Sequence, residues 1–170
     1  YYRTLFAVGY PRYVGPNWLH SLITFDHPIA ISMCIYPADS GQTLKDLRRK
    51  IAEMEATVGN DVQSGRVADQ TVQVALEDAL SLQVQLAQGS ERFCQFGLYI
   101  TLSATTKEEL ESVTHEVESA LSSLLIIGKV ATLESEEGFK ATVPFFQDRL
   151  GILKNMDTTS LAMSFPFSSA

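Results

Sequence analysis

The chain has 170 residues, with 45% hydrophobic and 19% charged side chains, which is close to a globular composition and excludes a disordered chain. Its net charge of -7 argues against a general nucleic-acid-binding protein, because phosphate binding requires a basic surface. The sequence contains no run of 18 apolar residues, so no segment has the composition of a transmembrane helix.

The first quarter of the chain predicts two strands and a short helix. Residues 3–10 are rich in aromatic and β-branched side chains and predict a strand that ends before Pro11. Asn17 is expected to cap a short helix over residues 18–24. The apolar run over residues 29–36 is too short for a typical helix and predicts a buried strand.

Two long helices are predicted next, over residues 43–58 and 69–88. Apolar residues recur in both at spacings of three and four, which is the period of an amphipathic helix. Gly89 is expected to end the second helix. A short connection between the two helices makes them a helical hairpin. The apolar positions of the first helix are Leu44, Leu47, Ile51, Met54 and Val58.

A long strand and a capped helix follow the hairpin. Residues 92–103 predict a strand whose core face is formed by every second residue from Cys94 to Leu102. Thr106 and Glu109 have the spacing of a capping box, in which each side chain binds a free amide at the start of a helix. The helix is therefore expected over residues 106–125.

The remaining pattern is less regular. Residues 126–134 predict a strand, residues 136–148 predict a helix disturbed by Pro144, and the chain from Leu150 reads as an irregular tail with space for one more short strand.

This order of elements predicts an α/β (α+β-like) fold, with a mixed sheet and long helices, including the hairpin, mostly on one face. The strands that flank the hairpin are expected to be antiparallel, because a hairpin returns the chain to the end of the sheet that it left. The strands over residues 92–103 and 126–134 are expected to be parallel, because a single helix connects them.

Sequence motifs for nucleotide chemistry are absent. The only Gly-Lys pair, Gly128-Lys129, is followed by Val130, where the P-loop pattern requires Ser or Thr. The dinucleotide pattern G-x-G-x-x-G is also absent. Cys34 and Cys94 lie in apolar stretches without zinc spacing, so we interpret them as two buried free thiols. Neither a catalytic residue nor a metal or cofactor site is therefore predicted.

Two segments with acidic residues each have two alternative interpretations. Asp26 beside His27 could orient that histidine for catalysis, or the pair could simply form a turn before Pro28. Glu134, Glu136 and Glu137 could bind a cation, but we interpret them as the start of the next helix, where carboxylates favour the positive end of the helix dipole.

Aromatic residues are dense near the start of the chain. Tyrosine and tryptophan are enriched in interaction hot spots, so these side chains could form a partner surface, and they could equally belong to the core. Both interpretations remain open from the residues alone. The candidate partner surface consists of Tyr1, Tyr2, Tyr10, Tyr13 and Trp18, with Phe6 nearby.

Several segments together resemble the N-terminal region of the motor ATPases of conjugative transfer and type IV secretion, the VirB-type and Tra/Trs-type family. Each segment alone is a weak signal, and the resemblance depends on their order and spacing over essentially the whole chain. The segments are residues 1–14, 47–50, 74–80, 91–101 and 155–162, followed by Phe165-Pro166-Phe167.

The resemblance implies a single non-catalytic α/β domain over residues 1–150 and a tail over residues 151–170 that leads to a C-terminal RecA-like ATPase domain. ATP and Mg²⁺ would bind only that later domain, and the parent protein would be a bacterial ATPase that assembles as a hexamer. Its expected place is the cytoplasmic face of the inner membrane, with peripheral membrane contact only.

The expected function is therefore docking to inner-membrane secretion subunits and assembly of protomers, without direct nucleic-acid binding. The alternative is an independent small α/β enzyme or ligand-binding domain, with a site near Asp26 and His27.

Overall fold

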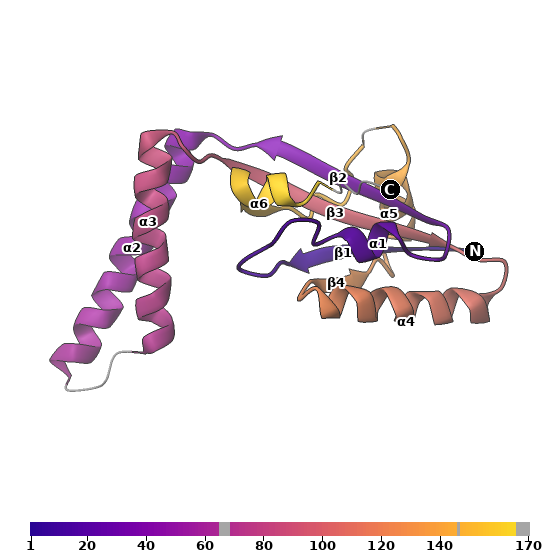
Figure 1. The fold of residues 1–170 in the computed structure, drawn as a ribbon, viewed down its shortest axis with the longest axis horizontal. Helices are drawn as coiled ribbons and strands as arrows, with labels where there is room; N and C mark the ends of the chain where they lie inside the picture. The colour runs from indigo at the N-terminus through magenta and orange to yellow at the C-terminus, as the bar shows by residue number, and fades with distance from the viewer. Residues whose placement is uncertain (65–68, 146, 166–170) are drawn as a thin grey trace. The chain divides into compact units, whose positions relative to one another are not determined.

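The computed structural model describes residues 1–64, 69–145 and 147–165 (Figure 1). The chain divides into two compact units. The first comprises Tyr1–Tyr36 and Cys94–Ala170 and contains the sheet, so it is called the sheet unit below. The second comprises Pro37–Phe93 and is called the hairpin unit. The α/β fold class predicted from the sequence is confirmed.

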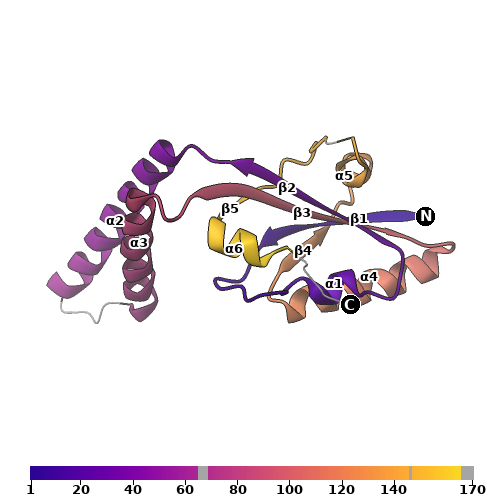
Figure 2. The same cartoon turned by 45° about the horizontal axis from the view of Figure 1, so that its top comes forward.

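In the described residues, five strands form one sheet, in which β2, β3, β1 and β4 are neighbours in that order and β5 also pairs with β3 (Figure 2). The central strand β3 is the longest of these strands. It pairs with β1 from the start of the chain and with β5 from its later part. The strands are β1 (Tyr2–Gly9), β2 (Ile29–Pro37), β3 (Phe93–Ser103), β4 (Ile127–Val130) and β5 (Lys154–Asp157).

Strand β1 determines the pairing pattern of the sheet. It runs antiparallel to both of its neighbours, with Thr4 opposite Thr101 of β3 and Phe6 opposite Lys129 of β4. Strands β3 and β4 therefore run in the same direction, as predicted, but they are not neighbours. Figure 1 shows β2 and β3 running in opposite directions, also as predicted. Because β1 inserts between two parallel strands, the sheet is antiparallel rather than mixed.

The described part of the sheet unit contains four helices. The capping box of α4 is confirmed: the Thr106 hydroxyl accepts a hydrogen bond from the Glu109 amide at 3.1 Å, and the Glu109 carboxylate accepts one from the Thr105 amide at 2.9 Å. The helices are α1 (His20–Ile23), α4 (Lys107–Ser123), α5 (Ser135–Thr142) and α6 (Thr158–Met163).

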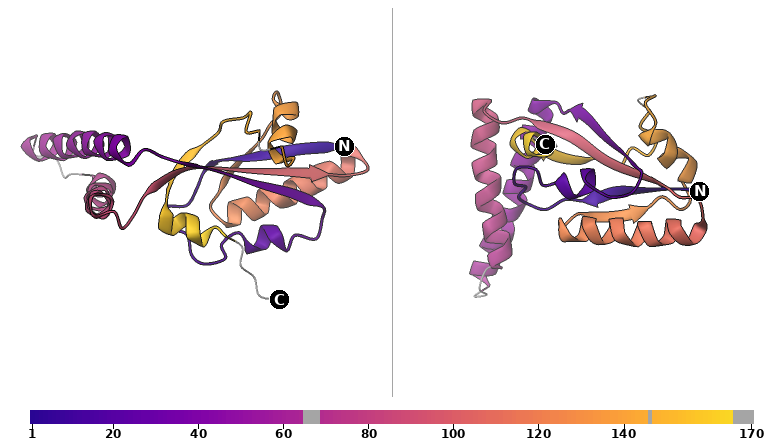
Figure 3. Two further views of the ribbon diagram at one scale, coloured as in Figure 1. Left: turned by 90° about the horizontal axis from the view of Figure 1, so that it is seen from above. Right: turned by 45° about the vertical axis from the view of Figure 1, so that its right-hand side comes forward.

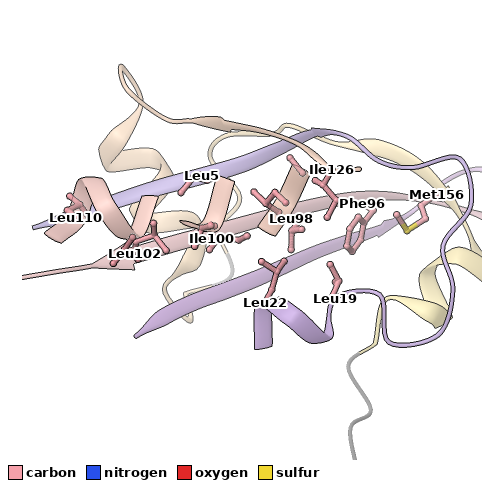
Figure 4. Packing of buried hydrophobic residues seen from close by; sticks show 14 residues of the cluster. Leu5, Leu19, Leu22, Phe96, Leu98, Ile100, Leu102, Leu110, Ile126 and Met156 are labelled. Carbon is pink, nitrogen blue, oxygen red and sulfur yellow. The ribbon is translucent and has the colours of Figure 1, made fainter. Parts of the chain in front are cut away.

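The hydrophobic core lies between the sheet and the helices α1 and α4 (Figure 4). The predicted core face of β3 is confirmed, except that Cys94 at its start is only half-buried. Leu98 is 1% exposed and packs in one cluster with Leu22 of α1 and Val117 of α4. The other cluster members labelled in Figure 4 are Leu5, Leu19, Phe96, Ile100, Leu102, Leu110, Ile126 and Met156.

The second face of β3 is buried as well, which the alternation in the sequence did not indicate. Tyr99 is fully buried and Thr101 is 5% exposed, because α5 and the segment around Ile152 cover this face. Figure 3 shows α5 on the opposite side of the strands from α1 and α4. Within the sheet unit, α1, α4 and α6 lie on one side of the strands and α5 on the other, so the helices are mostly on one face, as predicted.

Two local predictions near the first helix and second strand are corrected. Asn17 has a left-handed backbone with φ of 59°, and its carbonyl rather than its side chain accepts a hydrogen bond from His20. The helix therefore starts later than expected, at His20, after Leu19. Strand β2 is only half-buried, because it is the edge strand of the sheet.

The predicted helical hairpin is present in the hairpin unit, with α2 (Ser40–Gln63) packed along α3 (Gln70–Gln88). The Asp69 side chain accepts a hydrogen bond from the amide of Thr71 at 2.8 Å and so caps α3. Gly89 ends α3 in the left-handed conformation with φ of 74°, as expected for a glycine cap.

The segment expected to be an irregular tail contributes to the sheet unit. Strand β5 is the additional short strand for which the sequence left space, and Met156 is buried in the core. Asp157 caps α6 by accepting a hydrogen bond from the Ser160 amide at 2.6 Å. The sequence pattern did not predict α6. Pro166 and Phe167, which completed the family resemblance, lie outside the described residues.

Candidate functional site: an aromatic groove

An open groove of about 390 Å³ lies on the sheet unit, on the face that α5 covers, and is called the aromatic groove below. Its floor comes from β3, one wall from α5 and the residues that follow it, and the other wall from the start of β2. The lining is mainly apolar. The lining residues are Tyr2, Pro28, Ile29, Ala30, Thr101, Ser103, Phe139, Thr142, Val143 and Pro144.

A chain of hydroxyl groups fixes the floor of the groove to its helical wall. The Thr4 and Thr101 hydroxyls lie 2.7 Å apart, and the Thr101 and Thr142 hydroxyls also lie 2.7 Å apart. Thr4 belongs to β1, Thr101 to β3 and Thr142 to the end of α5. Buried hydroxyls require partners, and these three satisfy one another while holding α5 on the sheet.

Helix α5 approaches β1 closely because it carries a glycine at the contact. A β-carbon at Gly138 would lie 2.9 Å from the Thr4 β-carbon and 3.2 Å from that of Ala131. The neighbouring Phe139 is thereby held beside Tyr2, with ring centroids 5.2 Å apart and planes tilted by 56°. These two rings form an aromatic pair with 37% and 66% of their surfaces exposed.

A second recess of about 310 Å³ adjoins the aromatic groove and shares Tyr2, Pro28 and Ser103 with it. Tyr1 lines this recess, and the Lys107 ammonium lies 5.9 Å from the centroid of its ring. Glu109 supplies an acidic edge. Hydrogen bonds from the Thr105 hydroxyl and amide lower the pKa of that carboxyl, so it carries its charge at neutral pH.

The aromatic residues proposed as a partner surface divide into two groups. Tyr1, Tyr2 and Tyr13 are 59%, 66% and 84% exposed, and the first two line the groove and its adjoining recess. Tyr10 and Trp18 instead pack against the core, which confirms the core interpretation for these two residues. The partner surface formed by the exposed tyrosines stays a prediction.

The two inward-facing aromatic residues are fixed by specific contacts. The Tyr10 ring lies 5.4 Å from that of Phe96, and burial raises the pKa of its hydroxyl above the ordinary range. The Trp18 indole donates a hydrogen bond to the Ser164 hydroxyl at 3.1 Å. The sequence analysis did not identify Phe139. The one feature of the sequence that indicated its position is Gly138, a glycine inside a predicted helix.

The alternative site near Asp26 and His27 stays a prediction, and neither residue belongs to the aromatic groove. Asp26 is exposed, and the His27 imidazole lies 3.8 Å from the Glu116 carboxylate. The next residue, Pro28, does line the groove. Within residues 1–64, 69–145 and 147–165, the structure contains no group of three His, Cys, Asp or Glu side chains placed to hold a metal ion.

The other singled-out residues have structural roles. Glu136 and Glu137 lie in the first turn of α5 and Glu134 is its N-cap residue, which confirms their interpretation as a helix start. Glu136 also forms an ion pair with Lys140. Cys34 and Cys94 are free thiols, as predicted, but both are half-buried rather than buried.

Comparison of the chain with models of known protein families and with curated proteins finds no match. Among the helices that the structure describes, none combines the length and the apolar character needed to cross a membrane.

Proposed function

We propose that this chain is a non-catalytic docking and assembly domain of a type IV secretion motor ATPase. The observation that carries the docking role is the aromatic groove, an open and mainly apolar surface with the Tyr2 and Phe139 rings exposed at its side. Exposed aromatic pairs beside a preformed apolar groove are typical of sites that bind the apolar side chains of another protein.

The composition of the groove supports binding rather than catalysis. Of its polar side chains, Thr101 and Thr142 are hydrogen-bonded to each other, and the described residues of the lining include no carboxylate, imidazole, amine or thiol. A hydrolytic or transfer reaction requires a nucleophile or proton acceptor within reach of the substrate. We therefore assign the groove to a partner protein.

The family resemblance supplies the identity of that partner. We infer that the groove binds an inner-membrane subunit of the secretion apparatus, at the cytoplasmic face of the membrane, and that the sheet unit makes no direct contact with nucleic acid. ATP and Mg²⁺ would act in a RecA-like domain of the parent protein.

Site-specific photo-crosslinking in cells tests the docking role. A benzophenone amino acid at Phe139 is expected to crosslink to a membrane subunit of the secretion system. The matched control is the same amino acid at Tyr13, which is 84% exposed but does not line the groove. Equal crosslinking from both positions, or crosslinking from Tyr13 alone, would contradict docking through the groove.

Two further measurements test the motor assignment separately from docking. The gene downstream of Ala170 is expected to encode a G-x-x-x-x-G-K-[ST] loop between a strand and a helix. The purified chain itself is expected to show no heat of binding on titration with ATP and Mg²⁺. A stop codon directly after Ala170 would refute the motor assignment, and measurable ATP binding would refute the non-catalytic role.

A further inference from the structure

The two helices of the hairpin unit bury little of their apolar surface. Among the described residues of Pro37–Phe93, only Ile51 is buried, at 5% exposed. Helix α4 has only 17 residues and buries five side chains against the sheet unit. Amphipathic helices gain most of their stability from packing of the apolar face. The hairpin therefore has an apolar face that is incompletely packed.

Two pairs of exposed apolar residues lie on one side of the hairpin. Leu80 and Val84 are 40% and 54% exposed and lie one turn apart on α3. Ala52 and Ala56 are exposed and lie one turn apart on α2. Viewed along its own helix axis, each pair lies about 100° around the helix from the residues that contact the other helix. Because the helices are antiparallel, these displacements bring both pairs to the same side of the hairpin.

Charge changes sign along the length of the hairpin. Residues 40–50, where α2 begins, contain four basic residues and one acidic residue, a net charge of +3. Residues 51–78, which include the connection between the helices, contain six acidic residues and one basic residue, a net charge of -5. Residues 79–90 carry no charge. One end of the hairpin is therefore basic, and the end at the connection is acidic.

We propose that a second copy of this chain docks on the Leu80–Val84 side of the hairpin, in an antiparallel arrangement that forms a four-helix bundle. A two-fold axis would place the basic end of each hairpin over the acidic end of the other. It would also bring Leu80 and Val84 of both copies to the centre, where they complete an apolar core. A parallel arrangement would instead oppose like charges.

The charge pattern favours a second copy of this chain over other partners at this surface. The chain has a net charge of -7, so two copies repel each other unless opposite charges meet at the interface. Arg48 and Glu77 are both exposed, and helical periodicity places them on the same side as Leu80. The proposal concerns a surface separate from the aromatic groove. It specifies the assembly part of the proposed function, and its test does not depend on docking at the groove.

Sedimentation of the whole chain over a range of concentrations tests the apolar part of the interface. The unaltered chain is expected to form a dimer, and the Leu80→Glu, Val84→Glu double variant is expected to dissociate at least about tenfold more readily. The matched control compares the single variants Val84→Glu and Gln85→Glu, because these adjacent exposed positions lie about 100° apart around α3 and only Val84 belongs to the proposed interface. Circular dichroism checks that all variants keep their helices.

Charge reversal tests the antiparallel arrangement. Arg48→Glu alone and Glu77→Arg alone are each expected to weaken the dimer, and the two together in one chain are expected to restore it. A chain that stays monomeric at every concentration, or a double reversal that fails to restore a dimer, overturns the proposal. Arg48-dependent binding of a monomer to phosphatidylglycerol vesicles would assign this face to a lipid surface and also overturn it.

Discussion

Replacement of Gly138 by alanine tests how closely α5 is held against β1. The added β-carbon would lie 2.9 Å and 3.1 Å from the β- and γ2-carbons of Thr4, well inside the ~3.5–4.0 Å at which carbon atoms attract each other. Thr4 cannot turn away, because it is 2% exposed and its hydroxyl is hydrogen-bonded to Thr101. Such overpacking costs about 1–3 kcal/mol. Alanine regains about 1 kcal/mol of helix propensity.

The expected net result is a loss of about 1 kcal/mol in the free energy of unfolding, since the clash outweighs the propensity gain. Urea unfolding followed by the fluorescence of Trp18 measures it, because this residue is the only tryptophan and packs in the core of the sheet unit. Gly15→Ala is the control, since a β-carbon there meets nothing within 4 Å. A Gly138→Ala variant more stable than the unaltered chain would refute close packing of α5.

Three other predictions concern the sheet unit. Burial and the hydrogen bond to Asp148 raise the pKa of Tyr99, so only the unfolded chain ionises at that position above pH 10.0, and the free energy of unfolding should fall as pH rises beyond that value. Stability measured by urea titration that stays flat there, or falls equally in Tyr99→Phe, would contradict it. Thr106→Ala should remove the cap of α4 and cost about 0.5–2 kcal/mol in the same assay, whereas Thr106→Ser should cost little. Trp18→Phe removes the hydrogen bond to Ser164 and should lower the unfolding free energy by about 1 kcal/mol in calorimetry, and an unchanged transition would count against that bond.

Elements that depend on local chemistry were predictable from the sequence. The capping box at Thr106 and the left-handed cap at Gly89 use side chains or backbone conformations within a few residues of the helix ends. Strand β3 was also predictable, because its alternating large side chains span its full length. In each case, the information that determines the element lies inside the element itself.

Features that depend on distant contacts could not be derived in this way. The insertion of β1 between β3 and β4 is decided by pairing across the whole sheet unit, and no local pattern specifies it. The half-burial of β2 follows from its edge position, which its apolar sequence does not reveal. The short helix α6 is fixed by Asp157 at its start, in a stretch whose composition reads as irregular.

In the candidate site, too, some residues could be predicted from local sequence and others depend on distant contacts. Tyr1 and Tyr2 were identified because aromatic residues are frequent near the start of the chain. Phe139 was missed, because its place beside Tyr2 depends on the docking of α5 over β1, which a side chain at Gly138 would obstruct. A glycine inside a predicted helix therefore indicates a position where the helix packs closely against a neighbouring element.

The central place of β3 has a consequence for the order in which the chain folds. Strand β1 pairs with it from near the start of the chain, and β5 pairs with it from Lys154–Asp157. During synthesis, the sheet unit therefore cannot be completed until β5 has left the ribosome. The hairpin unit is formed by neighbouring helices, and its contacts are local, so it can fold while later residues are still being added.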